Sequence, residues 1–192
     1  MNEEVYQDKE EFKQDIIVAY QKAIQAFYDA GCRYLQLDDT AWADLFSAEG
    51  HEKLRAKGLD PAEELKLMQQ MINESIAKKP EDLTVTMHIC RGNYKSNYFT
   101  SGGYDYASEV IFGGLNVDGL FLEFDDERSG SFEPLKYVNR TNLKIVLGLI
   151  TSKAGELEDK EKIKARIQEA ATYVPLEQLC LSPQCGFSST EE

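Results

Sequence analysis

The chain has 192 residues, of which 42% are hydrophobic and 29% charged, a composition typical of a soluble globular protein, and we expect residues 1–192 to form one domain. Its 34 acidic and 21 basic residues give a net charge of −13, and a field of that sign argues against binding to nucleic acid or to an anionic membrane. The sequence has no membrane span, no secretory signal and only four cysteines, so we expect a reduced, cytoplasmic protein.

The first half of the sequence predicts two helices and two strands in alternation. A helix is expected over residues 9–30, where apolar residues recur near helical spacing, and a strand over 33–38 follows it. Asp60 and Pro61 mark the start of a second helix, with the aspartate as N-cap and the proline at the first helical position. The next apolar segment, 83–88, is expected to be a strand.

The second half continues the pattern with three more strands. A helix is predicted over 104–115 and a strand over 119–124. A strand over 144–150 and a charged amphipathic helix over 157–171 follow, and the last strand is expected over 178–182.

Short apolar strands separated by helices are typical of parallel strands covered by helices, which makes this an α/β protein. The predicted strands begin near residues 33, 83, 119, 144 and 178. This spacing is close to the roughly 31 residues that a (β/α)8 barrel spends on each unit. The five units therefore fit part of such a barrel, and an open, doubly wound sheet is the competing architecture.

Ionisable residues collect where the predicted strands end, and that edge is where parallel α/β folds build their sites. Asp38 ends the first strand, His88 and Cys90 the second, and Glu123 the third, while Cys185 follows the last. Because side chains alternate along an extended backbone, His88 and Cys90 project to the same face. One imidazole, two thiolates and one carboxylate favour zinc over magnesium or calcium.

The other candidate residues have simpler interpretations. Cys32 and Cys180 lie at or inside predicted strands, and we expect them to be small apolar core residues. His51 lies in an acidic segment and is expected to be solvated, and Asp38 has the alternative role of capping the helix that follows it.

Four spaced motifs resemble cobalamin-independent methionine synthase, and most closely its short, single-domain relatives. They are Gln36-Leu37-Asp38-Asp39, His88-Ile89-Cys90, the segment 119–135 around Glu123, and Pro183-Gln184-Cys185-Gly186. The sequence departs from the family pattern at Thr40, where the family has proline, at Gln184, where the full-length enzyme has aspartate, and after Glu123, where it reads FDDERS.

This resemblance implies a zinc-dependent methyl transfer to the thiol of homocysteine, giving methionine. His88, Cys90, Glu123 and Cys185 would be the zinc ligands, and Asp38 would be the catalytic, substrate-binding residue that holds the ammonium group of homocysteine. The methyl donor of the full-length enzyme is methyltetrahydrofolate. The alternatives are a non-catalytic zinc- or thiol-binding fragment and a zinc alkyltransferase acting on another thiol.

The resemblance also implies a partial (β/α)8 TIM barrel, because the catalytic domain of that family is a whole barrel. The 192 residues correspond to roughly its last five βα units. Two sheet edges would then lack their neighbours, so we expect self-association through these edges and little or no turnover by the isolated chain.

Overall fold

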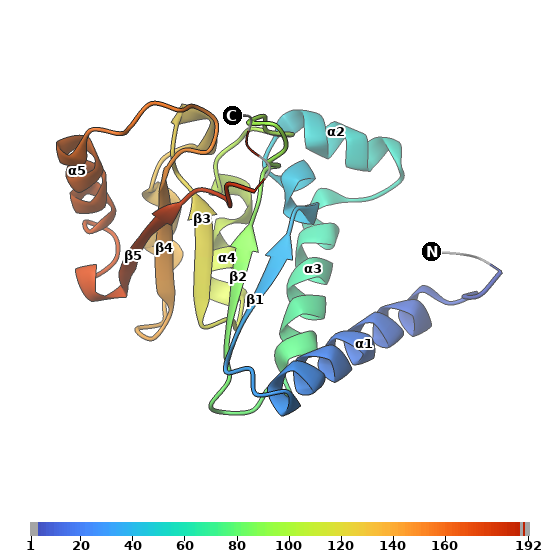
Figure 1. Ribbon diagram of the computed structural model, residues 1–192. Helices are drawn as coiled ribbons and strands as arrows, with labels where there is room; N and C mark the ends of the chain where they lie inside the picture. The colour runs from blue at the N-terminus through green and yellow to red at the C-terminus, as the bar shows by residue number, and fades with distance from the viewer. Residues whose placement is uncertain (1–3, 189, 191–192) are drawn as a thin grey trace.

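The computed structural model describes residues 4–188 and 190. Five strands form one sheet in the order β1-β2-β3-β4-β5, and every neighbouring pair is parallel (Figure 1). The strands are β1 (Tyr34–Asp39), β2 (Thr84–Ile89), β3 (Gly119–Glu123), β4 (Lys144–Ile150) and β5 (Leu179–Pro183). The five predicted strands are confirmed, and their bounds differ from the predictions by no more than one residue.

The α-helices of the described residues lie between the strands along the chain or before the first one. They are α1 (Lys9–Asp29), α2 (Ala48–Ala56), α3 (Pro61–Ile76), α4 (Ser108–Gly114) and α5 (Lys160–Ala170). The sequence did not predict α2. The helix expected over 104–115 is instead a short 3-10 turn followed by α4.

Aspartate caps fix where two of these helices begin. The Asp60 carboxylate accepts the amide hydrogens of Ala62 and Glu63 at the start of α3, as the sequence predicted. Asp159 accepts two amide hydrogens in the same way, and therefore α5 begins at residue 160 rather than at 157.

The two faces of the sheet differ in burial. The side chains on the sheet face that the helices cover form the core, together with apolar residues of α1, α3 and α4. Seven side chains from the central strands are at most 2% exposed: Val85, Met87, Ile89, Leu120, Leu122, Ile145 and Leu147. On the opposite face Gln36 and Cys180 are exposed, and Tyr34 is 55% exposed. This second face is the one that would line the inside of a closed barrel.

Two of the minor sequence interpretations are wrong. Cys180 is exposed because it lies on the open face of β5, not in the core. His51 is half-buried, because α2 packs its ring 4.2 Å from the ring of Tyr106 and its Nε2 donates to the Leu45 carbonyl at 3.1 Å. Cys32 is half-buried and packs against the edge of the core.

Within the described part of the chain, no helix has both the length and the apolar character needed to cross a membrane.

The two outer strands, β1 and β5, each have a neighbour on one side only. Unpaired strand edges promote association, so the purified chain should have an apparent mass above 21.8 kDa in light scattering, increasing with concentration. Leu181→Lys, which puts a charge on the β5 edge where leucine is 49% exposed, should reduce that mass. Val5→Lys, at a 66% exposed residue outside the sheet, is the matched control and should not. A monomer at all concentrations would contradict the prediction.

Candidate metal centre

Four side chains meet at the carboxyl end of the sheet, the edge to which the strand arrows point in Figure 1. His88 lies in β2, Cys90 directly follows it, Glu123 ends β3, and Cys185 lies two residues after β5. One ligand atom from each of the four lies within 4.8 Å of the others, and three of the residues are buried while His88 is half-buried. The fold thus brings together the residues that the sequence predicted as a cluster.

Hydrogen bonds orient the imidazole and the thiols. His88 Nδ1 donates to the Phe121 carbonyl oxygen at 3.2 Å, which leaves Nε2 directed at the Cys185 sulfur, 3.3 Å away. The sulfurs of Cys90 and Cys185 are 3.4 Å apart. A histidine held by a carbonyl through one ring nitrogen presents the other nitrogen to the cluster, as metal-binding histidines commonly do.

The two thiols differ in acidity. The hydrogen bond from Cys185 lowers the pKa of Cys90 to about 4, against the opposing effect of burial, and further hydrogen bonds from His88 and the Gly92 amide act in the same direction. The same sulfur–sulfur contact, together with burial, raises the pKa of Cys185. The contact between the two sulfurs therefore makes Cys90 the more acidic thiol of the pair.

Glu123 is fully buried, and each of its oxygens has a partner. Burial raises the pKa of its carboxyl group, while the hydrogen bonds from Arg128 and the Arg91 amide oppose that rise. Oε1 accepts from the Arg91 amide at 2.6 Å and lies 3.5 Å from the Cys185 sulfur, whereas Oε2 accepts from Arg128 Nη1 at 2.8 Å.

Sequence reasoning missed the buried arginine next to this cluster. The Arg91 guanidinium is inaccessible to solvent and lies over the rings of Tyr104 and Phe46, 4.2 and 4.7 Å from their centroids. It donates to the Gly102 carbonyl and to the Tyr104 hydroxyl, and that hydroxyl also accepts from the Glu123 amide. The sequence signal was only its place directly after Cys90.

Asp38 lies apart from the four clustered groups. It is exposed, pairs with His88 in the register of β1 and β2, and so projects from the same face of the sheet. Its carboxylate accepts from Gln36 Nε2 at 2.8 Å. The capping interaction that was its alternative role is made by Asp39 instead, whose carboxylate accepts from the Ala41 amide.

Polar side chains fasten the two cysteine-bearing loops together. Asn93 donates to the Gly186 carbonyl at 2.7 Å and accepts from the Ser152 hydroxyl, which in turn accepts from the Gln184 amide at 3.0 Å. These bonds hold the loop after β5 against the loop after β2, and hence Cys185 against Cys90.

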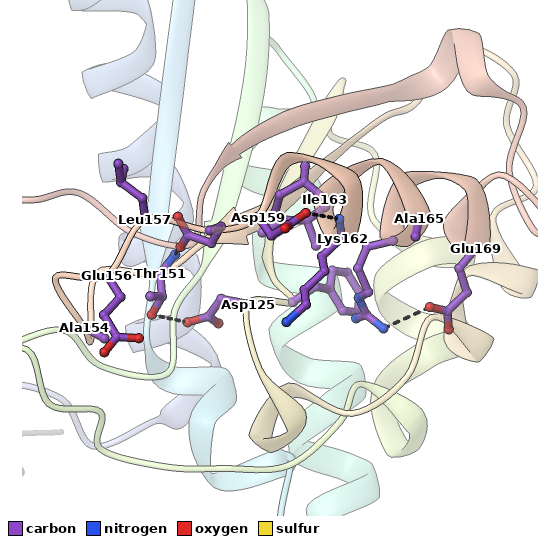
Figure 2. A pocket seen from close by; sticks show the side chains of 14 residues that line it. Asp125, Thr151, Ala154, Glu156, Leu157, Asp159, Lys162, Ile163, Ala165 and Glu169 are labelled. Atoms are coloured by element: carbon purple, nitrogen blue, oxygen red, sulfur yellow. Dashed lines mark hydrogen bonds and ion pairs between the residues drawn. The ribbon is translucent and has the colours of Figure 1, made fainter.

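A cavity of about 670 Å³ lies beside the cluster, between α5 and the loops that follow β3 and β4 (Figure 2). None of the four clustered residues lines it. Asp125 and Thr151 lie in its wall, joined by a hydrogen bond of 2.8 Å.

The donor set fits zinc. One nitrogen, two sulfurs and one carboxylate oxygen converge from separate strand ends, and thiolates with imidazole select zinc over oxygen-preferring ions. Fold and site together define a parallel α/β sheet that carries a cluster of two cysteines, one histidine and one glutamate, suited to a metal ion, at the carboxyl ends of its strands.

The chain belongs to the family described as the catalytic domain of cobalamin-independent synthase, whose model matches residues 3–192. It is 60% identical to the uncharacterised proteins YxjH and YxjG of Bacillus subtilis, covering 98% and 99% of this chain and 50% of each of those proteins. It is 25% identical to the methionine synthase of Pyrococcus furiosus, over 96% of this chain and 45% of that protein. The chain thus spans about half the length of the curated relatives it matches.

Solved structures agree with the fold. A protein from Listeria monocytogenes, provisionally assigned as a vitamin-B12-independent methionine synthase, is 55% identical and superposes with a TM-score of 0.78, over 95% of this chain and 50% of that one. A B12-independent methionine synthase from Shewanella, solved with selenomethionine, has a TM-score of 0.62 at 17% identity, over 90% of this chain and 47% of that one. The prediction of a partial (β/α)8 barrel is confirmed.

Proposed function

We propose that this chain is the zinc- and homocysteine-binding part of an enzyme that methylates homocysteine to methionine. The observation that carries the proposal is the convergence of His88, Cys90, Glu123 and Cys185. Membership of the cobalamin-independent synthase family supports it, as does the similarity to the Pyrococcus methionine synthase. In this proposal residues 1–192 form the C-terminal part of one barrel domain, and the protein acts in the cytoplasm.

The four ligands would have distinct roles. His88, Cys90 and Cys185 would hold zinc firmly, and the Glu123 carboxylate would be the weaker ligand. When bound, zinc supplies a site where the homocysteine thiol is deprotonated at neutral pH, although its ordinary pKa is near ~8.5. Three of the four ligands are buried, which would limit the access of water to the activated thiolate.

Asp38 would hold the ammonium group of homocysteine, because its exposed carboxylate lies on the same face of the sheet as His88. Asp38→Asn should keep zinc at one ion per chain and weaken homocysteine binding about tenfold or more, measured by calorimetry on the zinc-loaded chain. Glu52→Gln, at an exposed carboxylate on α2 outside the cluster, tests whether any loss of a negative charge has this effect. Loss of zinc from the Asp38 variant would contradict the assignment.

The activity is tested in a completed barrel. The half of Bacillus YxjH that this chain does not match can be joined to it, and the joined protein assayed with methyltetrahydrofolate and homocysteine. We expect methionine formation that stops on zinc removal and returns on zinc addition. Transfer to coenzyme M or another thiol instead would favour a different zinc alkyltransferase, and zinc binding with no transfer to any thiol would favour a non-catalytic module.

A further inference from the structure

Arg128, on the loop after β3, contacts the proposed metal ligand Glu123 directly. Its side chain is 7% exposed and that of Glu123 is fully buried, and Nη1 donates to Glu123 Oε2 at 2.8 Å. The other oxygen, Oε1, faces the Cys185 sulfur at 3.5 Å. The guanidinium therefore binds Oε2, and Oε1, which also accepts the Arg91 amide hydrogen at 2.6 Å, is the oxygen directed at the cluster.

Arg128 is itself held rigidly. Its Nη2 donates to both oxygens of Asp125, at 2.9 and 3.0 Å, and its Nε donates to Asp126 at 3.1 Å. Asp125 is fully buried and is fixed from the other side by the Thr151 hydroxyl, the contact drawn in Figure 2. The Tyr98 ring lies 4.9 Å from the guanidinium carbon. A guanidinium bound by three carboxylates has little freedom to release Glu123 Oε2.

The charges give this contact a chemical role. Two thiolates and one carboxylate around a zinc dication leave a net charge of −1, and a substrate thiolate adds another negative charge. A hydrogen bond from a cation withdraws electron density from a carboxylate, so Oε1 donates more weakly than an oxygen of a free carboxylate would. Occupation of Oε2 also keeps the carboxylate from binding a metal through both oxygens.

We propose that Arg128 is a positioning residue that presents Glu123 to the metal through one weakly donating oxygen, so that this ligand gives way when a thiolate enters. The inference rests on the proposed function and deepens it by assigning the element that makes Glu123 displaceable.

Cobalt(II) substituted for zinc in the 192-residue chain is the probe, because its absorption reports thiolate ligands and coordination geometry separately. Arg128→Gln should retain the thiolate-to-cobalt charge-transfer bands and shift the d–d bands, as the released carboxylate binds through both oxygens. The homocysteine concentration at half of the spectral change should rise about tenfold or more. Arg128→Lys, which keeps the charge, should return this midpoint toward that of the original chain.

Arg166→Gln is the matched control. Arg166 lines the cavity, lies 4.1 Å from the centroid of the Phe132 ring and pairs with Glu169, but it does not contact Glu123. Its cobalt spectrum and homocysteine midpoint should equal those of the original chain.

Two results would overturn the proposal. Unchanged d–d bands and midpoint in Arg128→Gln would show that Arg128 does not govern Glu123, and loss of the thiolate bands would show a merely structural role. If Arg128→Gln fails to fold, Arg128→Lys is the variant that tests the proposal. Its d–d bands should shift in the same direction as expected for Arg128→Gln, but by less. An unchanged spectrum would refute the role of Arg128. An original chain that binds cobalt but ignores homocysteine would refute the proposed function, while the d–d comparison would still test Arg128.

Discussion

Replacing Cys90 or Cys185 with serine is expected to abolish zinc retention, leaving less than about a tenth of an ion per chain after gel filtration. A serine hydroxyl stays protonated at neutral pH and binds zinc poorly, whereas a thiolate binds it strongly. Both sulfurs belong to the convergent set, so loss of either leaves three ligands. In the completed barrel, methyl transfer should be lost together with the metal.

The chain supplies its own controls for this experiment. Cys180 is exposed on the open face of β5 and Cys32 is half-buried before β1, and neither belongs to the cluster. Cys180→Ser and Cys32→Ser should retain one zinc ion per chain. Circular dichroism separates metal loss from unfolding. Equal zinc content in all four variants would refute the metal centre.

Replacing Arg91 with leucine should destabilise the fold by about 3 kcal/mol or more. The change removes both donors of the Gly102 carbonyl and one of the two donors of the Tyr104 hydroxyl, which keeps the Glu123 amide. A buried group left unsatisfied costs about 1–3 kcal/mol. It also removes the cation that contacts the Phe46 and Tyr104 rings. For a protein of this size the melting temperature should fall by roughly 6–12 °C.

The control for Arg91 is Arg55→Leu, at an exposed arginine on α2. This substitution removes the same charge and should change the free energy of unfolding by less than about 0.5 kcal/mol. Thermal unfolding followed by circular dichroism, at one protein concentration for all chains, is the measurement. Similar melting temperatures for both variants would mean that the buried guanidinium does not support the fold.

The strands and the clustered residues could be predicted without the structure. Segments such as 83–88 and 144–150 are short and rich in apolar residues. Their hydrophobic pattern and their length identify them as strands without knowledge of the fold. Once parallel strands are assumed, their carboxyl ends must lie at one edge, and for that reason His88, Cys90, Glu123 and Cys185 could be grouped although they span nearly a hundred residues.

The surroundings of those four residues could not be predicted in this way. Arg91, Tyr104 and Arg128 carry no local pattern that relates them to Glu123, because their contacts depend on how the loops after β2 and β3 fold back over the sheet. The exposure of Cys180 likewise depends on which face of β5 the helices leave open, since period alone cannot tell a covered face from a bare one. Hydrophobic patterning specifies elements along the chain, whereas burial and electrostatics at a site arise from neighbours distant in sequence.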